Sequence, residues 1–194
     1  MGCAFIIGFT GYKVYNEFFK KEKEPEAPQK VQLDSLELYG YTLNDDATEI
    51  YKTYFNELKE VLNKEEIDEI EYAKDITKLF VTDFYTLKNK ISSSDFGGLE
   101  FIHPRLKENF KLNAGDTIYN HVKTNLDGTR EQVLPEVKSV EITDATECEY
   151  AIDGENYKAY KVTATWEYTE DLGYEKEGTF FIVKEENKLY IVQK

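Results

Sequence analysis

The sequence predicts an α+β fold, with helices first and a curved, four-stranded antiparallel meander sheet last. Apolar residues recur at spacings of three and four over residues 50–62 and 65–90, which is the helical pattern. Apolar and polar residues alternate over residues 133–150 and again from residue 160, which is the pattern of half-buried strands. Because the two patterns occupy separate parts of the chain, they predict the α+β class.

The chain begins with an apolar and nearly uncharged segment, residues 1–19. Its first 12 residues carry no charge, whereas a membrane-spanning helix needs about 20 apolar residues. Three interpretations are open: part of a membrane anchor whose start lies upstream, a segment lying in the membrane interface, or an ordinary helix packed on the domain. The small residues Gly2, Gly8 and Gly11 favour the anchor. Cys3 lacks the polar tether that follows a lipoprotein cysteine, although palmitoylation beside a membrane stays open.

Residues 20–30 have the composition of a solvated linker. They carry charges of both signs and two prolines, and they contain no large apolar residue. Residues 31–194 are expected to form a single domain, so the predicted plan is an anchor, a short tether and a domain. The lysines that follow the apolar segment oppose export of that domain, and an upstream basic segment would override them.

The first elements of the domain are predicted to be helices. Residues 31–43 alternate only in part and suit either a strand or an extended lead-in. Residues 44–46, Asn-Asp-Asp, offer N-caps for the first helix, and Asn63 ends it. The second helix is expected over residues 65–90. It is most apolar over residues 76–87, which we expect to lie deep against the aromatic face of the sheet.

The middle of the chain is expected to hold a loop and a third helical segment. Residues 92–98 are polar and contain a glycine pair, but they match neither a nucleophile elbow nor a phosphate-binding loop. Pro104 suits the first turn of the next helix. Gly115 interrupts the apolar pattern of that helix, so the segment is compatible with one helix or two.

The last third of the chain predicts the sheet. A first long strand over residues 133–150 is followed by a compact turn at Asp153 and Gly154. Strands over 178–184 and 189–193 follow the turn at 170–173 and are joined by a loop at 185–188. The side chains expected to face the core from the strand after the compact turn are Tyr160, Val162, Ala164, Trp166 and Tyr168.

Charge excludes some classes of partner. The chain has a formal net charge of −14, with 38 acidic and 24 basic residues. Residues 1–30 contain five Lys and four Glu, so the rest of the chain carries the negative charge. Nucleic-acid phosphates and anionic lipids require clustered Lys or Arg, so neither is an expected partner of the domain. The simplest function of the acidic surface is solubility.

The sequence identifies no catalytic, cofactor-binding or metal-ligating set. Cys148 falls in an expected strand and is interpreted as a small core or edge residue, with no disulfide to Cys3. His103 is expected before a helix and His121 near a helix C-terminus, and no carboxylate at a suitable spacing completes a metal site with them. Trp166 is expected in the core.

Asp83 is the carboxylate that stands out, because it lies in the most apolar helix. If it faced a pocket, burial would raise its pKa and suit it to acid–base chemistry. The alternative, which we favour, is that Asp83 lies on the helix face away from the core or caps a neighbouring element. The acidic run over residues 65–71 is interpreted as a solvated helix face, without the pattern of a calcium loop.

Helices followed by a four-stranded meander, with the strand patterns around Trp166, residues 180–183 and residues 189–192, resemble the nuclear-transport-factor-like (cystatin-like) α+β superfamily. The resemblance covers residues 45–194 and implies a cone between helices and sheet. Membrane-tethered members of this superfamily are scaffold components of Gram-positive conjugation and type IV secretion machines. Other members are isomerases and dehydratases that place an Asp or His in the cone. The fold alone leaves these functions open.

The leading hypothesis is a non-enzymatic, membrane-tethered envelope protein whose extracytoplasmic domain acts by protein–protein contact or scaffolding. The alternative is a small-molecule-binding module or a cone-pocket enzyme, with a pocket lined by Tyr and Phe around Asp83. A third possibility is self-association through exposed strand edges.

Overall fold

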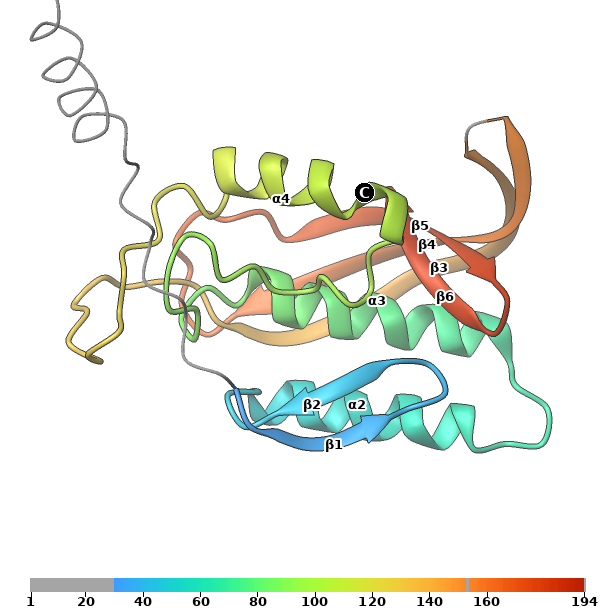
Figure 1. Ribbon diagram of the computed structural model, residues 1–194, viewed down its shortest axis with the longest axis horizontal. Coiled ribbons are helices and arrows are strands. Elements are labelled where there is room, and N and C mark those ends of the chain that lie inside the picture. The colour runs from blue at the N-terminus through green and yellow to red at the C-terminus, as the bar shows by residue number, and fades with distance from the viewer. Residues whose placement is uncertain (1–29, 153, 194) are drawn as a thin grey trace, which may run out of the picture.

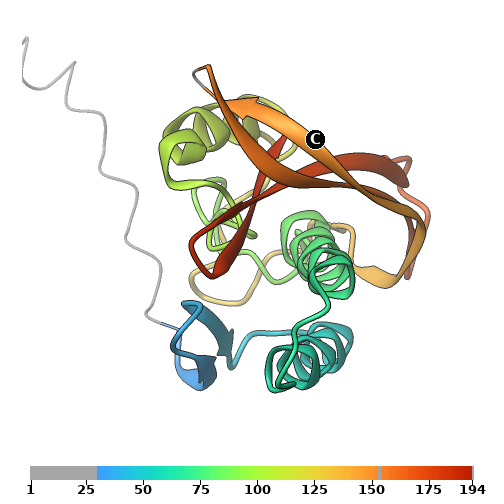
Figure 2. The ribbon, with the colours of Figure 1, turned by 90° about the vertical axis from the view of Figure 1, so that its right-hand side faces the viewer.

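Helices and a four-stranded antiparallel sheet make up the chain in the computed structural model, which describes residues 30–152 and 154–193. Figure 1 shows the helices packed beside the sheet, together with a separate two-stranded hairpin. The predicted α+β class is therefore confirmed. The sheet is not strongly curled, so it falls short of the curved cone that the sequence led us to expect (Figure 2).

The sheet is a meander of β3 (Val137–Ile152), β4 (Glu155–Tyr168), β5 (Glu177–Glu185) and β6 (Lys188–Gln193). The strands lie in chain order and each is antiparallel to the next, as predicted. The first strand begins at residue 137 and not at residue 133. The reason is that Pro135 has no N–H for a strand ladder, and its carbonyl accepts hydrogen bonds from the backbone of Leu87 and Lys88 instead.

The predicted inward face of β4 is confirmed. The side chains of its five inward residues are buried, and Trp166 is a core residue with 3% exposure. In the register of the sheet, Val162 lies between Ala145 of β3 and Phe180 of β5. These side chains form the floor on which the helices pack.

Helix α2 (Glu49–Leu62) begins later than the sequence suggested. Its N-cap is Thr48, whose Oγ1 accepts a hydrogen bond from the N–H of Tyr51. The prediction of a cap at residues 44–46 was wrong, because Asn44 ends a strand and Asp46 pairs with the side chain of Lys30. The predicted end at Asn63 is confirmed, since this residue is the C-cap.

Helix α3 (Glu69–Tyr85) is shorter than the predicted span of 65–90. Asp68 sets its start, because its carboxylate accepts hydrogen bonds from the N–H groups of Ile70 and Glu71. The helix ends at Tyr85 because the N–H groups of Leu87 and Lys88 donate to the carbonyl of Pro135 and not to carbonyls of the helix. Its predicted deep burial is confirmed, with Ile76 and Leu79 fully buried.

The two long helices form two layers on one side of the sheet (Figure 2). α3 packs directly against the sheet, and α2 packs against α3 on the side away from it. α2 reaches the sheet at its edge, where the Tyr54 hydroxyl hydrogen-bonds both the N–H and the C=O of Val140.

Residues 31–43, which the sequence left between a strand and a lead-in, form a hairpin. β1 (Gln32–Leu36) pairs with β2 (Tyr41–Asn44) across a turn in which Gly40 has φ +65°. A positive φ of this kind favours glycine. The hairpin belongs to the core because the buried Tyr41 hydroxyl contacts Tyr72 at 2.8 Å and donates to the carbonyl of Leu189 at 2.9 Å.

The third helical segment consists of a short 3-10 turn, η1 (Pro104–Leu106), and helix α4 (Lys107–Asp116). Of the two arrangements left open at Gly115, the structure has one helix, because residues 117–121 form turns. Just before η1, residues 101–103 lie along β6: the N–H of Ile191 donates to the carbonyl of Phe101, and the N–H of His103 donates to that of Ile191.

The acidic run at residues 65–71 is largely exposed, as predicted, but it is not one helix face, so that part of the interpretation was wrong. Its first residues precede α3, Asp68 is the cap, and Glu69 is only partly exposed. The Glu69 carboxylate accepts hydrogen bonds from Lys158 at 2.8 Å and from Tyr160 and Lys184. This network ties the start of α3 to β4 and β5.

The Glu69 network predicts loss of stability in acid. Burial alone would raise the pKa of Glu69, but the three donors outweigh it and lower the pKa from 4.5 to about 2. The stabilisation is therefore complete above pH 4.5 and lost as the pH falls towards 2. Glu69→Gln is expected to cost about 1–2 kcal/mol at pH 7, since the lysines are partly exposed, and much less at pH 2.5. Urea denaturation of the wild type and of Glu69→Gln at both pH values measures the difference in the free energy of unfolding.

Glu71→Gln serves as the matched control for Glu69→Gln. Glu71 lies in the same helical turn but pairs only with Lys74 on the surface, so its loss should cost less than about 0.5 kcal/mol. An equal cost of Glu69→Gln at both pH values would contradict the network.

The predicted membrane segment, residues 1–19, and Cys3 lie outside the described residues, as does most of the linker at 20–30. Within the part of the chain that is described, no helix combines the length and apolar character needed to cross a bilayer. Cys148 lies on β3, half-buried, and burial raises the pKa of its thiol.

Candidate functional site

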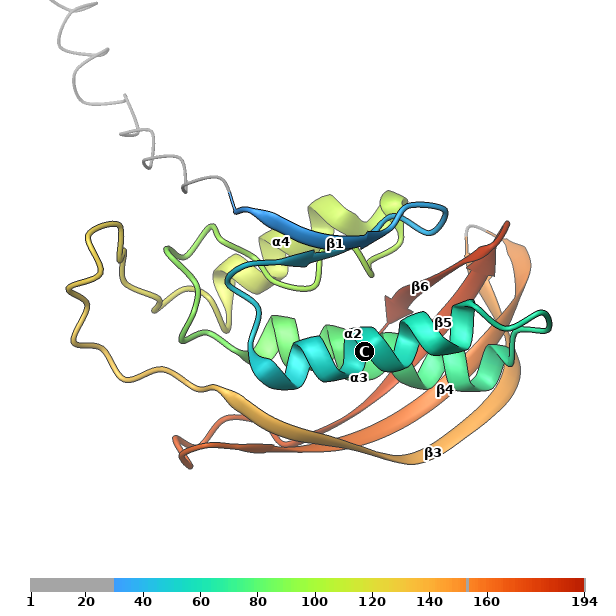
Figure 3. The ribbon, with the colours of Figure 1, turned by 90° about the horizontal axis from the view of Figure 1, so that it is seen from below.

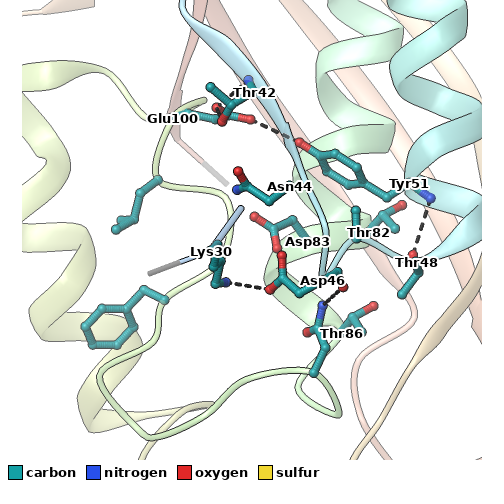
Figure 4. Close-up of a pocket in the computed structure, with 14 residues that line it drawn as sticks. Lys30, Thr42, Asn44, Asp46, Thr48, Tyr51, Thr82, Asp83, Thr86 and Glu100 are labelled. Carbon is teal, nitrogen blue, oxygen red and sulfur yellow. Dashed lines mark hydrogen bonds and ion pairs between the residues drawn. The ribbon is translucent and has the colours of Figure 1, made fainter. Parts of the chain in front are cut away.

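A small polar pocket lies where the β1–β2 hairpin, the start of α2, the end of α3 and the loop over residues 91–100 meet (Figure 4). Its volume is about 170 Å³. The ionisable side chains that line it are Lys30, Asp46, Tyr51, Asp83 and Glu100. The sequence singled out one of these, Asp83, and gave no signal that the other four would join it from separate elements.

Both carboxylate oxygens of Asp83 are engaged. Oδ1 accepts a hydrogen bond from the ammonium of Lys90 at 2.6 Å, and Oδ2 accepts one from the backbone N–H of Gly98 at 2.6 Å. The side chain of Lys90 is fully buried. The carboxylate therefore fixes the loop against the end of α3 and neutralises a buried charge.

The glycine pair in this loop permits the contact. A Cβ at Gly97 would lie 2.3 Å from the carbonyl oxygen of Asp83, and a Cβ at Gly98 would lie 2.7 Å from the ring of Phe80. Gly98 also has φ +75°, which L side chains rarely adopt. The Gly97 N–H donates to the hydroxyl of Tyr119 at 2.9 Å, so the loop is held on both sides.

The environment of Asp83 does not suit general acid–base catalysis. Burial alone would raise its pKa, but the Lys90 ammonium, the Gly98 N–H and the more distant Lys30 together hold the pKa below its ordinary value. Asp83 lines a pocket without the raised pKa that the acid–base alternative required, so it is ionised at neutral pH. Of the two alternatives for Asp83, the structure supports a fastening role for a neighbouring segment.

Glu100 fastens the opposite wall of the pocket. One oxygen accepts hydrogen bonds from the N–H and the hydroxyl of Thr42 at 3.0 and 2.9 Å, and the other accepts one from the hydroxyl of Tyr51 at 3.0 Å. Burial raises the pKa of Glu100, although these donors partly oppose it. Ligand pockets typically enclose about 300–1,000 Å³, so this smaller pocket is best described as a polar junction between elements.

A larger and more apolar hollow of about 700 Å³ lies on another side of α3. Its walls come from α3, from α4 with the turn after it, and from the loop between β4 and β5, and they include Phe80, Phe84, Tyr85, Phe110, Ile118, Leu172 and Tyr174. Asp83 does not line it. The structure thus separates the aromatic pocket and the Asp83 site, which the sequence had led us to expect together.

The two histidines lie apart. His121 is exposed in the turn after α4 and lines the rim of the hollow. His103 is buried before η1, where its Nδ1 accepts a hydrogen bond from the N–H of Arg105, and burial lowers its pKa. No group of three or more His, Cys, Asp or Glu side chains within the described ranges is placed to hold a metal ion.

The face of the sheet turned away from α3 carries a second apolar cluster. Ile152, Ala159 and Val183 are buried there. Half-buried side chains surround them and form what we call the outer patch: Cys148, Tyr150, Tyr157, Phe181, Tyr190 and Val192. The ring centroids of Tyr150 and Phe181 are 5.3 Å apart. The other end of the same face is polar, with Thr163, Thr165 and Glu167.

No protein-family model, curated protein or solved structure matches this chain.

The outer patch was not predicted, although the sequence contains a signal for it. Residues 180–183 read Phe-Phe-Ile-Val and residues 189–192 read Leu-Tyr-Ile-Val. Such runs place apolar side chains on both faces of a strand, which is typical of strands covered on both sides. The predicted alternation described only the face that packs on α3.

Proposed function

We propose that this protein is a non-enzymatic, membrane-tethered envelope protein that acts by protein–protein contact through the outer patch. The observation that carries the proposal is the composition of the patch. A sheet face in solvent is expected to be polar, and here one half is polar while the other half carries three Tyr, one Phe, one Val and one Cys. Contiguous patches of this kind mark interaction sites, and Tyr and Phe are enriched at interfaces.

The engagement of the polar side chains also supports a non-enzymatic role. Asp83 and Glu100 line the polar pocket, and their oxygens accept hydrogen bonds from structural partners. Both residues fasten loops and helices into one unit. A rigid domain that presents one aromatic surface is suited to scaffolding.

The tether is part of the proposal. Residues 1–19 serve as the membrane anchor and residues 20–30 as the spacer that holds the domain on the extracytoplasmic side. The negative charge of the domain favours a partner whose surface is basic, because complementary charge accelerates association. The order of helices before a four-stranded meander supports membership of the nuclear-transport-factor-like superfamily, in the tethered form of the Gram-positive scaffold domains.

Fractionation of native cells with a photo-crosslinking residue in the outer patch tests the proposal. We expect the full chain to sediment with membranes, to be clipped near residues 20–30 by protease added outside, and to form a crosslinked protein adduct from position 181. Position 165, at the polar end of the same face, is the matched control. A soluble, protease-protected protein without an adduct would overturn the proposal.

The aromatic hollow favours a second candidate function, the binding of a small apolar molecule between helices and sheet. Its volume of about 700 Å³ lies in the range of ligand pockets, about 300–1,000 Å³. Titration with an apolar fluorescent probe tests this: binding should be lost in Phe110→Glu and kept in Leu112→Glu, because Leu112 is exposed on α4. Equal binding by both variants would remove this candidate.

A further inference from the structure

The two edges of the sheet differ in how they are protected. Residues 101–103 cover the edge at β6 through backbone hydrogen bonds on both sides of Ile191. At the other edge, the hydroxyl of Tyr54 accepts a hydrogen bond from the N–H of Val140 and donates one to its C=O. β3 is the edge strand on this side of the sheet (Figure 3). In the described chain, no strand pairs with its outer side, including the stretch that follows Val140.

The register identifies the backbone groups that face outward from this open edge. In an antiparallel ladder, successive residues of an edge strand direct their N–H and C=O alternately towards and away from the neighbouring strand. Val140 points away, since it bonds Tyr54. A bulge between Ile142 and Asp144 shifts the alternation by one residue. The residues whose backbone groups point away from β4 after the bulge are therefore Ala145, Glu147, Glu149 and Ala151.

The side chains along this stretch differ between the two faces. Glu147 and Glu149 share the face that continues the inner side of the sheet, and both are exposed. Cys148 and Tyr150 lie on the other face, within the outer patch. A second copy of β3 paired antiparallel here would bring carboxylates close to carboxylates, which is destabilising. This edge is therefore poorly suited to self-association.

We infer that the open stretch of β3, residues 144–152, binds an extended segment of a partner protein in which basic residues alternate with apolar ones. The inference rests on the proposed contact function and specifies its partner. Main-chain hydrogen bonds to the outward-facing residues supply affinity, as in other strand additions. Lys or Arg on one face of the added strand pairs with Glu147 and Glu149, and apolar side chains on the other face extend the outer patch beyond Tyr150.

Binding of a short synthetic peptide to the full-length protein tests the inference. The probe alternates lysine with valine, and its control is the same peptide N-methylated at alternate amides, which cannot form the ladder. We expect saturable binding of the probe only, with isotope-edited infrared bands of an added strand. Glu149→Lys should weaken binding about fivefold, the value of one cross-strand charge pair of about 1 kcal/mol.

Two further variants make the result decisive. Glu147→Pro removes an outward-facing N–H that β4 does not use, so the fold should persist, as far-UV circular dichroism will show, while binding weakens about tenfold. Glu141→Lys changes the same charge on β3 before the bulge and should leave binding unchanged.

Equal binding of both peptides, or equal loss in Glu141→Lys and Glu149→Lys, would overturn the inference. An adduct from position 181 in cells together with failure of the peptide would remove the strand-addition model alone.

Discussion

Replacing Asp83 with asparagine is expected to lower the free energy of unfolding by about 3–5 kcal/mol, because it leaves the buried ammonium of Lys90 without its counter-ion. The Lys90 side chain has no exposed surface, and its 2.6 Å contact to Asp83 is the ion pair that compensates its burial. Urea denaturation of the wild type and of Asp83→Asn at pH 7 measures the difference. Asp46→Asn is the control, because the pair of Asp46 with Lys30 is partly exposed and should be worth less than about 1 kcal/mol.

A double-mutant cycle separates this charge effect from lost packing. In Asp83→Asn with Lys90→Met, no buried charge is left unpaired, so the double variant should be more stable than Asp83→Asn alone. Additive losses in the two single variants would contradict the assignment of Asp83 as the counter-ion of Lys90.

Gly97→Ala is expected to destabilise the protein by about 3 kcal/mol or more, the upper range for overpacking. The added Cβ would meet the backbone carbonyl of Asp83 at 2.3 Å, and a backbone atom at the end of a buried helix cannot move aside as a flexible side chain can. Thermal unfolding followed by circular dichroism measures the effect.

Gly115→Ala provides the control for Gly97→Ala. Gly115 lies in the last turn of α4, where a Cβ would be 3.4 Å from the ring of Phe96, an ordinary contact. Alanine is favoured over glycine by about 1 kcal/mol in a helix interior and by less in a last turn, so this variant should be neutral or slightly more stable. Similar destabilisation by both substitutions would show that the close approach of Gly97 to Asp83 does not limit stability.

The sheet and the long helices could be predicted from sequence because each has a strong local period. The side chains of β4 alternate over nine residues from Tyr160 to Tyr168, and burial follows that alternation. Helix boundaries were less predictable, since they depend on caps and competing hydrogen bonds. The carbonyl of Pro135, about 50 residues away in the chain, ends α3 by accepting from Leu87 and Lys88.

The site was predictable only in part. Asp83 stood out as a carboxylate among apolar residues, but its partners Lys90 and Gly98 reach it only after the loop folds back on α3. The loop can approach α3 because Gly97 and Gly98 have no Cβ, and the sequence does not show that the two segments come so close. The outer patch was not predicted for a different reason. The alternation on β4 indicates only one apolar face, whereas β5 and β6 are apolar on both faces.

The thiol of Cys148 offers the most direct test of the proposed contact function, because it lies in the outer patch of the native chain. We would compare the rate of its alkylation at pH 8.5 in native membranes with the rate in the purified full-length protein, using mass spectrometry to identify the labelled peptide. Thr165→Cys, at the polar end of the same face, reports general access. If a partner covers the patch, Cys148 reacts at least about tenfold more slowly in native membranes while position 165 is unaffected. Equal rates for Cys148 in the two preparations would contradict the proposal that this face is a protein contact surface.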